Sequence, residues 1–184
     1  MIHSNFTAEL HCKYGQVGAV NWPFGHSPLD STAEDGWLCA QRTYSEAKAF
    51  EPLRLRFRFI EQVNERTHYK IYCEEGFSFK GARLDQSRGG WLGLYGAFVV
   101  GRLIDSVNPV SAAELNSTIW KVQALEAWDG SVEGAEGLPL HLRDGLGFRV
   151  ALAKAKPGSK SRFLHAGEGD AEVLTFQLRN IQLA

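Results

Sequence analysis

The sequence predicts an all-β domain, and three observations support this fold class. The 184 residues include 19 glycines, 11 phenylalanines and 5 tryptophans but one methionine, which suits short strands and tight turns better than long helices. Apolar and polar residues alternate with period two in several segments, most clearly at 53–60, where three arginines alternate with leucine and phenylalanine. A pair formed by an aromatic residue and a leucine also occurs three times, each time followed by another alternating strand.

We expect the strands to be short and separated by turns rich in glycine and proline. In chain order they cover residues 6–12, 36–41, 53–60, 68–74, 91–95, 97–104, 118–125, 147–153, 162–166 and 173–183. Residues 21–30 contain two prolines and one glycine and are expected to form an ordered loop. Residues 111–128 fit either a helix, because Ser111 and Glu114 have capping-box spacing, or a strand at 118–125, which the repeat pattern favours.

The aromatic-leucine pairs indicate three copies of one unit, which consists of a first strand, a hairpin, the aromatic-leucine strand and a returning strand. The first strands start near Ala8, His68 and Gly147, the aromatic-leucine strands at Trp37, Trp91 and Phe163, and the returning strands at Leu55, Ile119 and Phe176. We therefore expect one domain over 1–184, with approximate repeats at 1–66, 67–130 and 131–184 whose unequal gaps are loop insertions. Three units around an axis can close a sheet and remove its edges.

This order resembles the β-trefoil superfamily, in which three four-stranded units form a six-stranded barrel capped by three hairpins. The resemblance spans most of the chain as a pattern and is closest from 148 to 181. The lectin branch of that superfamily carries a Gln-x-Trp signature near the end of each unit. The corresponding positions here are Phe57-Arg58-Phe59, Ile119-Trp120-Lys121 and Gln177-Leu178-Arg179, so the sugar-binding residues of that branch are not carried over. A β-sandwich or jelly roll of about ten strands is the alternative fold.

Composition and charge narrow the classes of function and partner. A formal net charge of -1 gives no global field that would attract nucleic acid or anionic lipid, so no nucleic-acid partner is predicted. No apolar run approaches the roughly 20 residues of a membrane-spanning helix. Residues 1–5 resemble no signal peptide, which predicts a soluble protein, cytoplasmic or released without such a signal. Cys12, Cys39 and Cys73 form no CxxC pair and are expected to be small buried thiols.

The motifs of common catalytic sites are absent from the sequence. It contains no Gly-x-Ser-x-Gly elbow, no His-Glu-x-x-His motif and no Walker loop, and its six histidines are scattered. We therefore assign no catalytic residue, no metal ligand and no cofactor. An enzyme whose paired carboxylates meet only in the folded chain is the third hypothesis, and it is less favoured than a binding function.

Aromatic residues beside polar ones in turns indicate where a ligand binds. Sugars need a flat apolar surface for their C–H groups and carboxylates or amides for their hydroxyls. Trp22, His26 and Asp30 in one loop, and Trp128 and Asp129 in another, offer this combination outside the repeat pattern. The sequence therefore predicts a non-catalytic, lectin-like carbohydrate-binding module that recognises glycans through these residues.

The alternative function is a protein-binding module, such as a protease inhibitor or a toxin-associated recognition domain. Its contacts would come from the inserted loops at 21–35, 104–117 and 126–146. Two other features are interpreted as structural. Trp91 is expected in the core, because it matches Trp37 and Phe163 in the repeats. The arginines of 53–60 are expected to form a solvated, ion-paired face.

Overall fold

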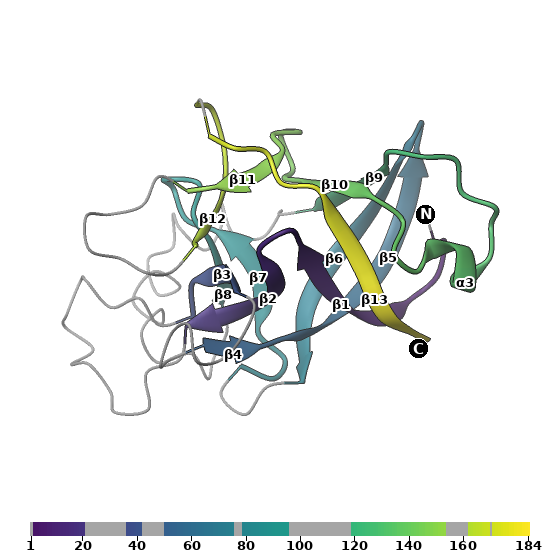
Figure 1. Ribbon diagram of the computed structural model, residues 1–184, viewed down its shortest axis with the longest axis horizontal. Coiled ribbons are helices and arrows are strands. Elements are labelled where there is room, and N and C mark those ends of the chain that lie inside the picture. Colours follow the sequence, from purple (N-terminus) through teal and green to yellow (C-terminus); the bar gives the residue numbers. More distant parts are fainter. Residues whose placement is uncertain are drawn as a thin grey trace.

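The computed structural model describes residues 2–20, 36–41, 50–75, 79–95, 119–153, 162–169 and 171–184 (Figure 1). Their strands are β1 (Phe6–Cys12), β2 (Gly15–Val20), β3 (Leu38–Gln41), β4 (Phe50–Pro52), β5 (Arg54–Val63), β6 (Arg66–Glu75), β7 (Arg83–Gln86), β8 (Leu92–Tyr95), β9 (Trp120–Ala124), β10 (Leu140–Arg143), β11 (Val150–Leu152), β12 (Leu164–Ala166) and β13 (Phe176–Leu183). The described residues also contain one short helix, α3 (Val132–Ala135), between β9 and β10. The predicted all-β fold class is confirmed.

Six of these strands pair in a closed ring. The order around the ring is β1, β5, β6, β9, β10, β13 and back to β1, and every pairing is antiparallel. The β5–β6 pairing is long, whereas β10 meets β13 through the single register pair Leu140 and Phe176. Because each strand of the ring has a neighbour on both sides, the ring leaves no long edge exposed.

Three hairpins, β2–β3, β7–β8 and β11–β12, lie outside the ring. Their second strands meet one another through the isolated bridges Trp37–Gly93, Cys39–Phe163 and Trp91–His165. Figure 1 shows α3 and both termini on the right and these hairpins on the left. The three predicted aromatic-leucine strands are therefore brought together at one end of the fold.

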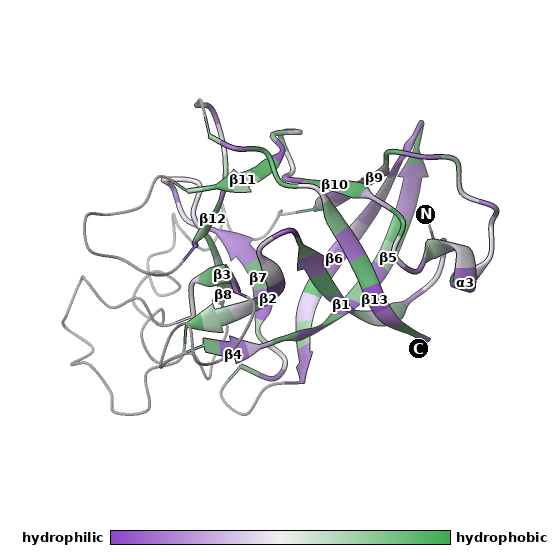
Figure 2. Cartoon of the chain, viewed as in Figure 1, coloured by the Kyte–Doolittle hydropathy of each residue, from purple (hydrophilic) through white to green (hydrophobic). Residues whose placement is uncertain are grey.

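Aromatic side chains fill the ring and the space beneath the hairpins. Inside the ring, Phe6 stacks on Phe57 with ring centroids 4.7 Å apart, and Tyr69 meets both rings edge-on. Under the hairpins, the half-buried Trp91 packs against Trp37 and Phe163, as the repeat pattern predicted. Figure 2 shows the resulting alternation of hydrophobic and hydrophilic residues along the strands. The inward residues of each strand therefore make the core and the outward ones are left for ligands or solvent.

The structure changes one predicted strand and decides one open choice. The strand predicted at 147–153 is present as the shorter β11 at 150–152, which pairs with β12, and the ring strand that precedes it is β10 at 140–143. Gly147 has φ +100°, so a turn and not a strand precedes β11. The strand expected at 118–125 is present as β9, so the helical alternative is wrong for 120–124, while its proposed start at Ser111 and Glu114 lies outside the described residues. The strand expected at 97–104 lies outside the described residues.

Candidate ligand-binding site

The predicted ligand residues fall into two groups in the structure. Trp22, His26 and Asp30 lie outside the described residues. Trp128 and Asp129 are described, and they precede α3 in the connection between β9 and β10.

The polar atoms of Trp128 and Asp129 bind the neighbouring turn. The Trp128 indole Nε1 donates to the Ser131 carbonyl at 2.7 Å, and its half-buried ring packs edge-on against His3. The backbone N–H and the hydroxyl of Ser131 each donate to Asp129 Oδ1 at 2.8 Å, which lowers the pKa of that carboxyl. The Ser131 hydroxyl in turn accepts from the N–H of Gly134 as the N-cap of α3. These side chains therefore hold the entry to α3.

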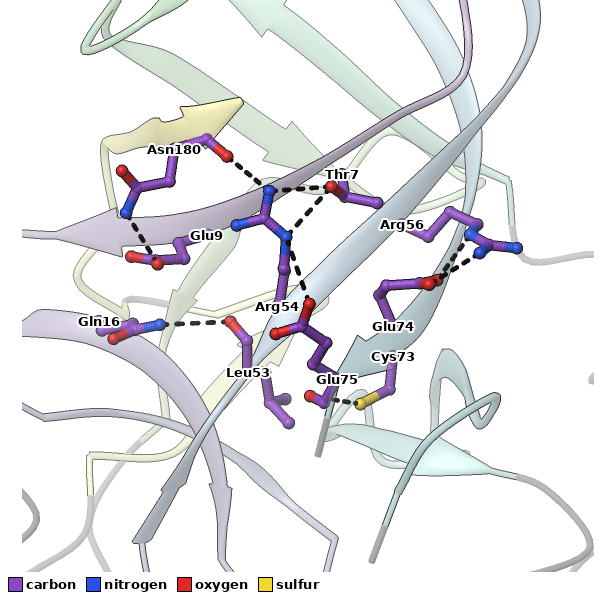
Figure 3. Close-up of polar contacts among 10 residues, drawn as sticks. All are labelled: Thr7, Glu9, Gln16, Leu53, Arg54, Arg56, Cys73, Glu74, Glu75 and Asn180. Atoms are coloured by element: carbon purple, nitrogen blue, oxygen red, sulfur yellow. Dashed lines mark hydrogen bonds and ion pairs between the residues drawn. The ribbon is translucent and has the colours of Figure 1, made fainter. Parts of the chain in front are cut away.

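Two arginines of β5 are also engaged within the fold, as Figure 3 shows. Arg54 donates to the Thr7 hydroxyl at 3.0 and 3.1 Å and to the Asn180 carbonyl at 2.8 Å. Arg56 forms an ion pair with Glu74 at 2.6 Å. The ion-paired interpretation of this face is confirmed for Arg56. The side chains of Arg54 and Arg56 therefore bond to other strands of the ring.

An open pocket lies beside the turn between β5 and β6. Its volume is about 430 Å³, and its lining residues are Val63, Asn64, Glu65, Arg66, His68, Lys121 and Gln123. Asn64 has φ +55°, which an asparagine tolerates in a tight turn. Arg66, His68, Lys121 and Gln123 of the lining come from the paired strands β6 and β9, so the sheet register sets the positions of these four.

The same register places more cations beside the pocket. On β9, Gln123 pairs with Arg66 of β6 and with His141 of β10, while Lys121 pairs with His68 and Arg143. The intervening residues Thr67, Val122 and Leu142 are buried. Because side chains alternate across a strand, Gln123, Lys121 and the residues that pair with them lie on the opposite, outward face. Arg149 lies beyond Arg143 through an isolated antiparallel bridge. We call Arg66, Lys121, His141, Arg143 and Arg149 the basic face.

Neutral groups hold two side chains of the basic face, those of Arg143 and Lys121, in place. Arg143 donates through Nε to the amide oxygen of Gln123 at 3.0 Å and through Nη1 to the Gly147 carbonyl at 2.8 Å. Lys121 donates to the Gly145 carbonyl. Arg66 Nη1 is 3.9 Å from the position that a Cβ would take on Gly147. Two guanidinium groups thus converge on the same glycine.

A buried carboxylate fixes the turn that carries these carbonyls. Asp144 is 1% exposed, and its Oδ1 accepts from the backbone N–H groups of Gly147 at 2.7 Å and Phe148 at 2.8 Å. Gln86 also reaches its Oδ2 at 3.4 Å. The Asp144 carboxylate is therefore oriented into the turn, and the carbonyls of the turn face the cations.

The cations of the basic face repel one another. Burial lowers the pKa of Arg143, and the positive charges of Arg66 and Arg149 lower it further. Burial likewise lowers the pKa of His141, followed by the charges of Arg149 and Arg143. Each named charge therefore acts against another cation of the same face, although the whole chain has a formal charge of -1.

The cysteines offer no reactive group at this site. Cys39 and Cys73 are buried, Cys12 is half-buried, and all three are free thiols. Burial, followed by the charges of Glu51 and Glu74, raises the pKa of the Cys73 thiol to about 12. A thiol that stays protonated at neutral pH is a poor nucleophile. The prediction of buried thiols is confirmed for Cys39 and Cys73.

Searches for a metal site, a membrane-spanning helix and similar proteins each gave a negative result. Over the described segments, no three side chains of His, Cys, Asp or Glu gather as a metal site. No helix among the described residues has the length and apolar character needed to cross a membrane. Comparison of the chain with protein-family models, curated proteins and solved structures finds no match.

Proposed function

We propose that the chain is a non-catalytic carbohydrate-binding module of β-trefoil architecture. The pairing pattern supports this architecture through three successive four-stranded units, namely β1–β2–β3–β5, β6–β7–β8–β9 and β10–β11–β12–β13, with β4 in line with β5. The first and last strands of each unit belong to the ring. The middle two strands of each unit form a hairpin.

The pocket beside the β5–β6 turn is the observation that carries the binding function. Its volume of about 430 Å³ lies within the range of about 300–1,000 Å³ that small-ligand sites occupy. Two amides, from Asn64 and Gln123, and the Glu65 carboxylate can exchange hydrogen bonds with sugar hydroxyls. Val63 supplies apolar surface for the sugar C–H groups. The polar atoms of Trp128 and Asp129 are instead hydrogen-bonded within their own turn. We therefore propose that the glycan binds in this pocket.

The position of these groups on paired strands favours binding without a large rearrangement. Arg66 pairs with Gln123 and His68 with Lys121 in the β6–β9 register, so four lining residues have fixed backbone positions. The Gln123 amide oxygen is oriented further by Arg143. A site held by regular strands loses less conformational entropy on binding than one made by loops.

A glycan array with the labelled protein, followed by calorimetry on any sugar it identifies, tests this proposal. We expect Gln123→Met and Lys121→Met to weaken binding about tenfold, because each removes a polar group worth about 1.4 kcal/mol. Arg179→Gln on β13 is the control and should bind like the original protein. A blank array from a folded sample would refute the proposal. So would a sugar that binds both pocket variants with the same affinity as the original protein.

A protein-binding module is the second candidate, and exposed apolar side chains favour it. Leu146 is 81% exposed in the turn before β11, Val63 in the pocket lining is 42% exposed, and Leu125 after β9 is also 42% exposed. An acidic protein surface with an apolar centre would complement this combination of leucine, valine and cations. Inhibition of a serine or cysteine protease in a panel, weakened by Leu146→Ser and without glycan binding, would favour this candidate.

A further inference from the structure

We infer that the basic face extends the pocket into a track for an acidic polysaccharide, a chain whose sugars carry sulfate or carboxylate groups. This inference rests on the proposed carbohydrate-binding function and adds the chemical class of its ligand. The pocket holds one part of such a chain, and the cations beside it contact the charged groups of the sugars that follow.

The sheet register gives the track its length. One row across β6, β9, β10 and the residue before β11 contains His68, Lys121, Arg143 and Arg149. Neighbouring strands are about 4.8 Å apart, so three steps span roughly 14 Å. A second row, in which Arg66 is the cation nearest the pocket, runs parallel to the first. It lies two residues away along each strand, a distance of about 7 Å. The face is therefore longer than one sugar ring and presents charge at repeated intervals.

The charge on the track is left without carboxylate partners in the described part of the chain. Arg66 and Arg149 make no side-chain hydrogen bond or ion pair with another described residue, while Lys121 and Arg143 bind only neutral oxygens there. At the near end of the row, His68 pairs with Glu61 at 3.2 Å. The cations beyond His68 are thus available to an anionic ligand.

Electrostatics makes bound anions favourable on this surface. Two unit charges about 6 Å apart repel by roughly 0.7 kcal/mol in water and by more where burial lowers the dielectric response. Several such pairs act together on the basic face, and Arg143 is half-buried among them. A sulfate or carboxylate between two guanidinium groups replaces this repulsion with charge-assisted hydrogen bonds.

The residues of the track favour an acidic polysaccharide over the other polyanions. Neither the basic face nor the pocket lining contains Phe, Tyr or Trp. Proteins that bind single-stranded nucleic acids stack bases on such rings. The amides of Asn64 and Gln123 adjoin the cations, so hydroxyl and acidic groups of one carbohydrate chain can be recognised together.

Binding of a size-fractionated heparin oligosaccharide, measured by calorimetry at several salt concentrations, tests the inference. The comparison ligands are its desulfated form, a neutral oligosaccharide, a single-stranded DNA of similar length and phosphatidylserine vesicles. We expect the sulfated ligand to bind most tightly, with log K falling by about 3 per decade of salt if four cations contribute. Arg66→Gln/Arg149→Gln should weaken it about tenfold and reduce that slope by about 1.5.

Matched variants separate this inference from the proposed function. Arg179→Gln makes the same chemical change on β13, outside the basic face, and should leave the affinity for heparin oligosaccharide unchanged. Equal affinity for sulfated and neutral sugars, with both affinities dependent on Gln123, would refute the track. The proposed glycan site in the pocket would then still stand. Sulfate-dependent binding that Arg149→Gln weakens but Gln123→Met does not affect would support the track and refute the pocket.

Two further outcomes would overturn the polysaccharide as the ligand. Tighter binding of the DNA, lost in Arg66→Gln/Arg149→Gln, would make the basic face a nucleic-acid surface. Tighter binding of the vesicles, lost in the same variant and in Leu146→Ser, would make it a membrane-contact surface. Circular dichroism and thermal unfolding confirm that each variant is folded, because neither Arg66 nor Arg149 holds another described side chain.

Discussion

Replacement of Arg54 by methionine should destabilise the protein by weakening the seam between β1, β5 and β13. The side chain is 12% exposed, and its guanidinium bridges the Thr7 hydroxyl and the Asn180 carbonyl (Figure 3). Hydrogen bonds from a charged donor contribute about 1.5 kcal/mol or more, so two acceptors give about 3 kcal/mol. The ion pair with Glu75 adds little, because its atoms are 4.0 Å apart and that carboxylate is 72% exposed.

Thermal and urea unfolding of Arg54→Met measure this contribution. For a chain of this size, about 3 kcal/mol corresponds to a Tm lower by roughly 6–12 °C. Arg54→Lys should lose about half as much, because one ammonium cannot bind both acceptors in the fixed fork geometry of a guanidinium. Arg58→Met on the same strand is the control, since the Arg58 side chain is exposed and bonds to no other described residue.

A double-mutant cycle decides whether the loss belongs to the seam. Thr7→Val removes the buried hydroxyl that Arg54 contacts, so the two substitutions should be coupled by about 1 kcal/mol. Additive effects would show that Arg54 acts through something other than Thr7. An Arg54→Met variant as stable as the original protein, or no less stable than the Arg58→Met control, would refute the reasoning.

The remaining predictions concern one residue each. Trp128→Phe loses the hydrogen bond to the Ser131 carbonyl, so stability should fall by about 1 kcal/mol in urea unfolding while glycan affinity stays unchanged. Gly18→Ala should cost about 2–3 kcal/mol in the same assay, because the new Cβ would lie 2.3 Å from the Phe50 ring. Since the folded-state pKa of His141 is lowered, the unfolded chain binds more protons below pH about 6.5. Stability should therefore decline as the pH falls, and His141→Gln should reduce that decline.

The first two of these results have outcomes that would contradict them, and the third residue also reports on ligand binding. Lost glycan binding with unchanged stability in Trp128→Phe would place the ligand at the loop before α3. A Gly18→Ala variant of full stability would mean that β4 can move away from β2, which the backbone pairing argues against. Heparin oligosaccharide should raise the pKa of His141 in an NMR titration, because a bound anion offsets the charges of Arg143 and Arg149. An unchanged pKa would contradict binding beside that imidazole.

The sequence predicts the strands well where alternation is long. Residues 53–59 alternate over seven positions and all but Leu53 lie in β5, a ten-residue strand of the ring, whereas β10 has four residues and follows a stretch rich in glycine and proline. Such a short signal cannot be separated from a turn without knowing its partners. The aromatic-leucine pairs were more informative, because Trp91 packs against both Trp37 and Phe163 where the hairpins meet.

The candidate site could be predicted only in part from the sequence. Aromatic residues beside polar ones led to Trp128, but the sequence does not show that its indole N–H is taken by a carbonyl three residues away. The basic face was missed because its members come from β6, β9, β10 and the residue before β11, and each strand contributes one or two cations. A formal net charge of -1 conceals the cluster, since the acidic residues of the whole chain outnumber the lysines and arginines by one. Strand register is the missing information.

Charge pairing, and not the number of arginines, distinguishes the two cationic surfaces of the ring. Arg54 and Arg56 come from the most arginine-rich strand, yet their side chains are engaged with oxygens of the fold. Arg66 and Arg149 are isolated in the sequence, but folding brings them beside Arg143 without a carboxylate partner among the described residues. A cation that already has a partner must break a contact to bind a ligand, whereas an unpaired one gains a contact. We therefore expect Arg66→Gln/Arg149→Gln to affect ligand affinity and Arg54→Met to affect chiefly stability.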